Sequence, residues 1–186
     1  FNGLASASIT LLMQFILAQF LGMTSALQLL ELSRPDQSLL RILLRDAPGT
    51  YQHSLQVSNL AEQAAERIGA DPLLTRVGAL YHDIGKILNP MFFIENQIPG
   101  FVNPHDNLDP YDSAEVITRH VPDGLELARK KRLPRPILSF IAQHHGTLIA
   151  RYQYVKAVQA AQGDESQVDQ EKFRYPGPRP QSRETA

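Results

Sequence analysis

The sequence predicts an all-α fold built as a bundle of helices, and three observations carry that prediction. Apolar residues recur at helical spacing through most of the chain, and proline and glycine separate the segments that show this pattern. Strict alternation of apolar and polar residues is not sustained anywhere, so we expect few strands. The chain has 186 residues, of which 43% are hydrophobic and 20% charged, which suits a single domain with a substantial core.

The N-terminal third is interpreted from charge, caps and apolar positions. Residues 1–23 carry no charge and are strongly apolar, so we interpret them as a helix at or near the exit from a membrane, with the membrane-embedded part missing from the chain. A buried core helix is the alternative. Helices are expected over 24–32 and 35–45. Thr50 is the candidate N-cap of the next helix, which stops at Gly69.

The remaining elements follow from the same signals. Asp71-Pro72 begins a helix whose apolar positions continue to Ile84, and Gly85 is expected to end it in a left-handed C-cap. Asn89–Pro110 is a long irregular stretch, and loops of this length in a compact domain often carry functional residues. Residues 163–186 are polar and proline-rich, which predicts an exposed or disordered tail and the start of a truncated C-terminal part. The other helices are expected at 110–121, 123–131, 134–145 and 149–161.

Composition restricts the chemistry. The net charge of −1 gives no general attraction to DNA, RNA or anionic lipid, so any phosphate chemistry must be local. The chain has no cysteine, which excludes disulfides, thiolate zinc sites and cysteine nucleophiles. Histidine, aspartate and glutamate are then the available metal ligands, and they leave Zn, Fe, Mn or Ni open.

Histidine is the residue type whose placement points to a site. Five of the six histidines lie within or at the ends of predicted helices, whereas His105 lies in the long loop and is more simply a residue that stabilises it. Helices that converge on a core can bring distant side chains into one cluster. A carboxylate stands directly beside one of these imidazoles. The predicted metal ligands are His53, His82, Asp83, His120, His144 and His145.

The order of these residues resembles that of HD-domain metal-dependent phosphohydrolases, and the strings around them are similar to a particular branch of that family. The branch is the cytoplasmic HD domain of the bacterial seven-transmembrane receptor HD hydrolases. The resemblance implies an HD-domain helical bundle, with the phosphohydrolase domain at 24–162. The strings that carry it are Leu29-Leu30-Glu31-Leu32-Ser33, Ala47-Pro48-Gly49-Thr50-Tyr51, His82-Asp83-Ile84-Gly85-Lys86, Phe93-Ile94-Glu95-Asn96-Gln97, Asn103-Pro104-His105-Asp106 and His144-His145-Gly146-Thr147.

The resemblance also implies an activity and a setting. The activity is hydrolysis of the second messenger cyclic di-AMP to the linear dinucleotide pApA. The expected cofactors are two divalent transition-metal ions, Fe or Mn before Zn or Ni. The expected location is the cytoplasmic domain of a bacterial inner-membrane protein, and a homodimer is left open. An HD phosphatase of nucleotides or alarmones and a non-catalytic nucleotide sensor are the alternatives.

Roles for individual residues follow as a hypothesis from the two-metal chemistry of such enzymes. Asp83 would bridge the ions and a metal-bridged hydroxide would attack phosphorus. His53 and His82 would hold one ion, and the other three histidines the second. Lys86 would neutralise charge on the phosphoryl oxygens, although a helix-dipole partner is the simpler role for a lysine there. His105 and Asn96 could reach the substrate from the long loop.

Two departures from the family pattern affect these expectations. The family has a further metal-ligating aspartate in an Ala-Asp-Ser motif, which is absent here, while Asp164 and Asp169 lie in a different context. The resemblance therefore implies an incomplete metal shell and weak or absent activity in this chain. The Gly-Tyr-Pro signature of cyclic di-GMP enzymes is also absent, because Gly146-Thr147 follows the paired histidines. That argues against cyclic di-GMP as the substrate.

Overall fold

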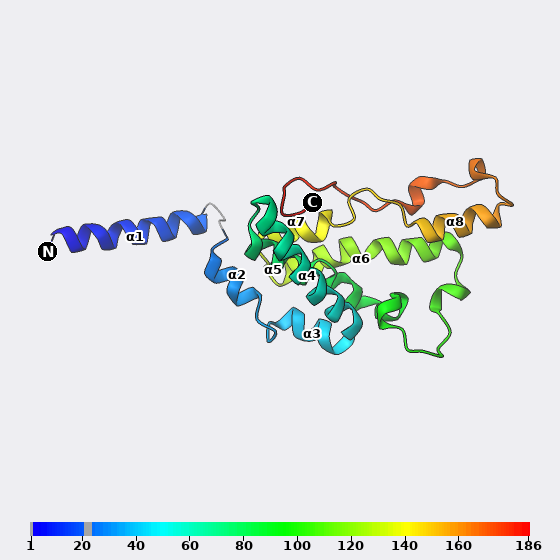
Figure 1. Cartoon of the computed structure of the whole chain (residues 1–186), viewed down its shortest axis with the longest axis horizontal. Coiled ribbons are helices and arrows are strands. Elements are labelled where there is room, and N and C mark those ends of the chain that lie inside the picture. Colours follow the sequence, from blue (N-terminus) through cyan, green and yellow to red (C-terminus); the bar gives the residue numbers. More distant parts are fainter. Residues whose placement is uncertain (1, 21–23) are drawn as a thin grey trace.

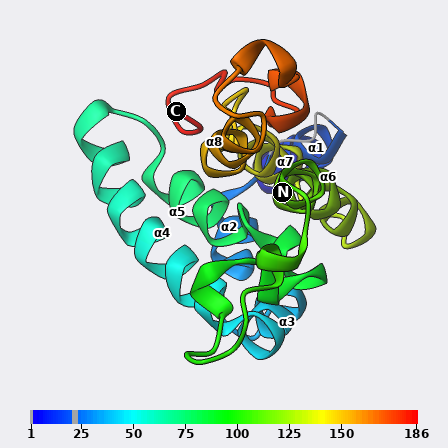
Figure 2. The same cartoon turned by 90° about the vertical axis from the view of Figure 1, so that its right-hand side faces the viewer.

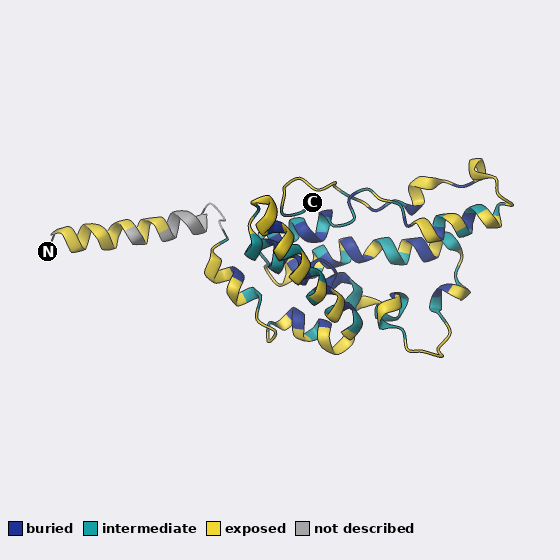
Figure 3. Ribbon diagram, in the orientation of Figure 1, coloured by how far each residue is buried: buried dark blue, intermediate teal, exposed yellow. Residues whose placement is uncertain are grey.

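The structure, a computed structural model, describes residues 2–20 and 24–186, and it is helical as the sequence predicts. Helix α1 (Asn2–Phe20) stands apart from the other helices (Figure 1), and Figure 3 shows its described surface as exposed. The exposed apolar side chains include Leu4, Ile9 and Met13, so this helix is not the buried core helix of the alternative interpretation. Positions 1 and 21–23 of the predicted segment lie outside the described residues. Among those described, no helix combines the length and hydropathy needed to cross a membrane.

The main core lies where the helices of the domain converge (Figure 2). Helix α3 shows why they pack: Leu39, Leu40 and Leu43 fall on one face and are buried, while Arg41 and Arg45 point to solvent. The deepest residues, including Val77 and Ile137, have no exposed surface. The helices that surround or cover this core are α2 (Ala26–Leu32), α3 (Ser38–Asp46), α4 (Pro48–Ile68), α5 (Pro72–Tyr81), α6 (Pro110–Lys130) and α7 (Arg135–Gln143).

Helix α6 is longer than the sequence predicts. Two helices meeting near Pro122 were expected, but the structure has a single helix that runs through this proline. Proline removes one backbone hydrogen bond and favours a break. Here Ala128 belongs to the main core and Leu125 packs against it, which keeps the helix continuous, while Pro122 itself is exposed.

A few C-terminal residues contribute to a second core, which corrects the prediction of a disordered tail, whereas most of 163–186 is exposed as predicted. Phe173 is fully buried against α6 and α8 (Arg151–Ala160). An isolated antiparallel β-bridge between Ile149 and Arg174 holds the backbone of the C-terminal segment. Two short 3-10 turns, η5 (Glu165–Gln167) and η6 (Gln170–Phe173), precede Arg174. Sequence polarity misled because a few buried aromatic side chains anchor an otherwise polar segment.

The long irregular stretch Asn89–Pro110 folds into 3-10 turns, one of which packs against the first turn of α4. These turns are η2 (Pro90–Phe92), η3 (Ile94–Asn96) and η4 (Pro104–Asn107). Thr50 is not the N-cap that was predicted, because α4 begins at Pro48. Instead the Asn96 side chain accepts a hydrogen bond from the Thr50 backbone N–H at 3.1 Å, and the Thr50 hydroxyl donates to Glu95 at 3.0 Å. A residue distant in sequence thus supplies the cap.

Gly85 serves a different purpose from the predicted left-handed C-cap. It lies within the 3-10 turn η1 (Ile84–Leu88), and its backbone has no positive φ. A Cβ added at this position would fall 1.8 Å from the His120 carbonyl oxygen. Glycine is therefore required for the close approach of η1 to α6, which brings the His82-Asp83 segment against His120.

Candidate metal centre

The predicted ligands come from four helices or their ends. Helix α4 carries His53 in its second turn, and His82 is the C-cap of α5 with Asp83 directly after it. His120 lies in the middle of α6, not near a helix end as predicted. The paired histidines follow α7, which ends at Gln143, earlier than expected. The structure brings all six side chains together, since Asp83 belongs to two groups whose ligand atoms lie within 4.8 Å of one another. The groups are Asp83, His120, His144, His145 and His53, His82, Asp83.

The Asp83 carboxylate is the centre of this cluster. Its Oδ1 lies 3.2 Å from Nε2 of His120 and 3.4 Å from Nε2 of His144. Its Oδ2 lies 3.1 Å from Nε2 of His82 and 2.8 Å from Nζ of Lys86. The side chain of Asp83 is 3% exposed. A carboxylate this deeply buried requires positive partners or a cation.

The protonation of three imidazoles is fixed by the backbone. Nδ1 of His82 lies 2.6 Å from the carbonyl oxygen of Ala79. Nδ1 of His120 and Nδ1 of His144 contact the carbonyl oxygens three residues before them at 2.6 and 3.0 Å. A carbonyl only accepts hydrogen bonds, so each Nδ1 carries the proton and donates. In the neutral rings, the Nε2 lone pairs then face Asp83 as available ligands.

The charges within the cluster follow from burial and from Asp83. Burial alone would raise the pKa of the Asp83 carboxyl, but the surrounding imidazoles outweigh it and hold that pKa well below its usual value. Burial lowers the pKa of His82, yet the Asp83 carboxylate raises it more, so the net shift is upward. Burial lowers the pKa of His144. Burial also lowers the pKa of His145, and with the charges of the neighbouring His144 and His120 rings that pKa falls to about 3. The paired histidines are therefore neutral at physiological pH.

The donor set fits a divalent cation. Nε2 of His120 lies 3.1 Å from Nε2 of His144, so two lone pairs face each other when both rings are neutral. Oδ1 of Asp83, which lies beside them, is buried and has no hydrogen-bond partner of acceptable geometry. Lone pairs that converge without protons between them repel, and a cation relieves that repulsion. Imidazole nitrogen and carboxylate oxygen are suitable ligands for such an ion.

The other predicted site residues lie around the cluster or away from it. Lys86 contacts Asp83 and, at 2.8 Å, Glu95, so its charge is shared by two carboxylates. Burial would lower the pKa of Lys86, but these carboxylates raise it. Asn96 caps α4 as described above. His105 lies in the loop and is held by the Phe92 carbonyl oxygen and by the Ser113 hydroxyl of α6. Neither of these last two residues belongs to the groups around Asp83.

Two contacts of the cluster were missed by sequence reasoning. The Tyr175 ring stacks on His145 with centroids 4.0 Å apart and an interplanar angle of 21°. The Phe93 ring meets His120 edge-on at 5.6 Å. The alternation of aromatic and polar residues from Phe173 to Tyr175 was the available signal in the supposed tail. The two aspartates of that region, Asp164 and Asp169, accept hydrogen bonds within their own turns.

A helical domain that gathers histidines from several helices around a His-Asp pair defines a class of metal-binding domain. Residues 50–184 match the family model described as HD domain, and the chain belongs to this family. The fold predicted from the resemblance, an HD-domain helical bundle, is thereby confirmed.

Similar proteins carry more specific names. The chain is 46% identical over 186 residues to Cyclic-di-AMP phosphodiesterase PgpH of Bacillus subtilis, and 46% identical over 165 residues to the protein of that name from Listeria monocytogenes. These matches cover 100% and 89% of this chain but only 25% and 22% of the relatives, so the chain spans about a quarter of their length.

A solved structure shows the same fold. The crystal structure of the L. monocytogenes PgpH HD domain in complex with cyclic-di-AMP matches with a TM-score of 0.76 and 46% sequence identity. The match covers 82% of this chain and 69% of that chain. The similarity therefore extends over most of the domain that carries the cluster.

Proposed function

We propose that this chain is the catalytic domain of a metal-dependent phosphodiesterase that hydrolyses cyclic di-AMP to pApA. The observation that carries the proposal is the convergence of imidazole lone pairs on the buried Asp83 carboxylate. This convergence occurs in a chain 46% identical to proteins named cyclic-di-AMP phosphodiesterase. Conversion to pApA requires attack of water on one of the two phosphodiesters, a reaction for which a metal centre is suited.

Two divalent ions, Fe or Mn, are the proposed cofactors. One would be held by His53 and His82 and the other by His120, His144 and His145, with Asp83 shared between them. The support is the division of the six ligand atoms into two groups with Asp83 in common. When bound, such ions lower the pKa of water and neutralise charge on the phosphoryl oxygens.

The residues of the chain orient and polarise this centre. The backbone carbonyls that accept from Nδ1 hold the rings of His82, His120 and His144 in one orientation. Lys86 holds Oδ2 of Asp83 and helps to keep the carboxylate ionised. Its fixed charge beside the centre also supports the proposed role in neutralising the phosphoryl group.

The proposed setting is the cytoplasmic side of a bacterial inner membrane, as part of a longer protein. The support is the greater length of the relatives together with the uncharged residues 1–23 and the exposed apolar side chains of α1. We place α1 next to the membrane. Light-scattering or flotation assays with phospholipid vesicles would test this, because deletion of residues 1–23 should abolish vesicle association.

The activity is tested by incubating the purified chain with cyclic di-AMP in the presence of Mn²⁺ or Fe²⁺ and separating the products by chromatography. We expect pApA, formed slowly because the metal shell lacks the aspartate of the family's Ala-Asp-Ser motif, with still slower turnover of cyclic di-GMP and of mononucleotides. Elemental analysis of the same sample counts the ions. Preferential release of phosphate from mononucleotides would favour a nucleotide phosphatase, and binding of cyclic di-AMP without products would favour a sensor.

A further inference from the structure

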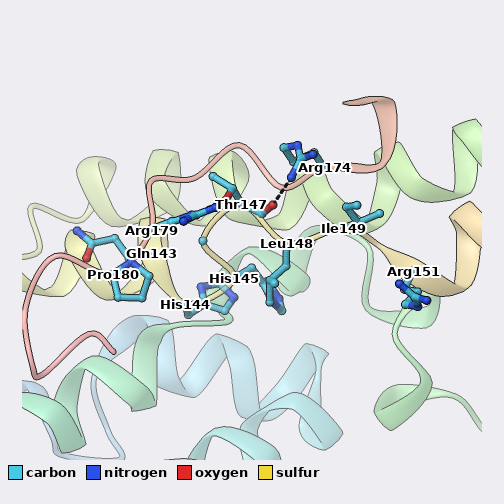
Figure 4. Close-up of a pocket in the computed structure, with 11 residues that line it drawn as sticks. Gln143, His144, His145, Thr147, Leu148, Ile149, Arg151, Arg174, Arg179 and Pro180 are labelled. Carbon is cyan, nitrogen blue, oxygen red and sulfur yellow. Dashed lines mark hydrogen bonds between the residues drawn. The ribbon is translucent and has the colours of Figure 1, made fainter. Parts of the chain in front are cut away.

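A basic cavity opens beside the metal centre. It has a volume of about 570 Å³, within the range of small-molecule sites, and the paired histidines form part of its wall. The rest of the wall comes from Gln143, from 146–149 and Arg151, and from the C-terminal residues Arg174, Arg179 and Pro180. Figure 4 shows Arg174 above Thr147 and Arg179 to the left of it, with His144 and His145 below them. The cavity therefore continues outward from the metal ligands.

The charges on this wall are positive and only partly compensated. Arg174 is paired with Glu171 at 2.7 Å and donates to the Thr147 carbonyl oxygen. Within residues 2–20 and 24–186, neither Arg151 nor Arg179 lies within 4.0 Å of a carboxylate oxygen. No acidic residue lines the cavity. An anion entering it would meet guanidinium groups available for pairing.

Arg179 is held in place by the surrounding structure. Its Nε donates to the Thr147 hydroxyl at 3.2 Å. Just beyond it, the backbone N–H of Gln181 donates at 2.9 Å to the side chain of Gln143, which is 5% exposed. Gly146 has a φ of +53° and passes close to Arg179, with its added Cβ 3.5 Å from the Arg179 Cα. The C-terminal segment is thus anchored to the end of α7 next to the metal ligands.

We infer that Arg179, braced by Thr147, binds the phosphate of the cyclic dinucleotide that is not being cleaved. This inference rests on the proposed function, because a cyclic dinucleotide carries two phosphodiesters and the metal centre takes one. The second phosphate must then lie outside the imidazole cluster, and the basic cavity adjoins it. The remaining Arg179 nitrogens can donate to phosphate oxygens in the forked geometry that favours guanidinium over ammonium.

The test compares a substrate with two phosphodiesters and one with a single phosphodiester. The ratio of kcat/KM for cyclic di-AMP to kcat/KM for bis(p-nitrophenyl) phosphate is measured for the native chain and for Arg179→Gln. We expect the ratio to fall about tenfold, the effect of losing one charge-assisted hydrogen bond, with KM for cyclic di-AMP raised and kcat nearly retained. Arg179→Lys should recover part of the loss because it keeps the charge.

Two control variants separate loss of the phosphate contact from a general loss of positive charge. Arg135→Gln removes one positive charge from the exposed start of α7, outside the cavity, and should leave the ratio unchanged. Thr147→Val removes the brace of Arg179 and should shift the ratio in the same direction as Arg179→Gln. Thermal unfolding of each variant checks the fold, and Arg179→Lys together with Thr147→Val decides the question if Arg179→Gln is unstable.

The outcomes distinguish the subsite from the proposed function. A native chain that makes pApA, with an Arg179→Gln ratio equal to the native one, overturns the subsite alone. A native chain that cleaves bis(p-nitrophenyl) phosphate but leaves cyclic di-AMP intact overturns the proposed function, and the subsite with it. An equal loss for both substrates would show that Arg179 acts on the metal centre in general and would also overturn the inference.

Discussion

The two halves of the candidate metal centre differ in how firmly the fold holds them. The inner group consists of Asp83, His120, His144 and His145, and the outer group of His53 and His82 with the shared Asp83. His120 is 2% exposed, and aromatic rings contact it and His145. His53 is exposed, and its ring centroid lies 5.7 Å from that of His82.

This difference shows which half is arranged before any ion binds. Backbone carbonyls hold His120 and His144, and the Tyr175 ring stacks on His145, so the geometry of the inner group is set by folding. In the outer group His82 is held by a backbone carbonyl in the same way, whereas His53 is exposed and lines a cavity of about 390 Å³ together with His82, His144 and His145. We therefore expect the inner group to bind its ion more tightly and the outer group to respond more to substrate.

The shared carboxylate should give the largest effect, because its loss affects both halves. Asp83→Asn should lower turnover of cyclic di-AMP by about 10³-fold or more, since it removes the charge on which the ligands converge. Metal content, measured by elemental analysis, should fall in parallel, while circular dichroism stays native. Asp106→Asn, at an exposed carboxylate in the loop, is the matched control. An Asp83→Asn chain with native metal content and turnover would refute the shared role.

Removing one ligand from each half tests the comparison directly. His144→Ala should weaken metal binding by about 100-fold or more. This exceeds the loss of affinity that follows when a residue that only hydrogen-bonds to a ligand is removed. His53→Ala should weaken it less and spare the inner ion. Titration of the metal-free chain with Mn²⁺ in a calorimeter gives both affinities. Equal losses in the two variants would show that the halves are not distinct.

The close contact between η1 and α6 can be disturbed without replacing any of the proposed ligands. Gly85→Ala should destabilise the fold by about 1–3 kcal/mol, the usual cost of overpacking, because the new methyl group meets the His120 carbonyl oxygen. Urea unfolding monitored by circular dichroism measures this change. Gly3→Ala, which meets nothing within 4 Å, should have no such effect. A stable Gly85→Ala chain would mean that η1 moves away from α6 at little cost.

The smallest expected effect is on pH-dependent stability at the edge of the cluster. Burial would raise the pKa of Glu95, but Lys86 outweighs it and the net shift is downward from the ordinary value of 4.5. The ionised carboxylate therefore stabilises the fold above pH 4.5, and this contribution is lost as the pH falls through the lowered pKa.

Glu95→Gln tests this contribution. The native chain should be more stable than the variant at pH 7 by less than about 1 kcal/mol, since the pair is partly exposed. The difference should disappear in acid. Thermal unfolding of both chains from pH 7 down to pH 3 measures it, and a difference that persists at pH 3 would assign the effect to packing rather than to charge.

The sequence predicted the helical fold well because apolar spacing and caps are local signals. It also selected Asp83 and the five histidines that the structure gathers around it, because a His-Asp pair with further histidines is an unusual combination. Their metal-binding roles stay predictions. The element boundaries after Ile84 were less accurate, since α6 passes through Pro122 and the residues after Gly163 fold back.

The errors share one physical cause, which is that long-range contacts decided the outcome. Thr50 is capped by Asn96 from another segment, and Gly85 is required by the His120 carbonyl rather than by its own turn. Phe173 is buried by α6 and α8, and Tyr175 is buried against His120 and His145. None of these partners can be identified from neighbouring residues in the sequence.

The origin of the ligands in four separate helices has a further thermodynamic consequence. The two proposed ions, one joining α4 to the end of α5 and the other joining that end to α6 and α7, would close long loops of the chain and act as reversible cross-links. Much of their binding free energy should then appear as resistance to unfolding. Chelators would in that case lower the free energy of unfolding of the domain as well as its activity. The supply of the ions would then influence how long the protein persists in the cell.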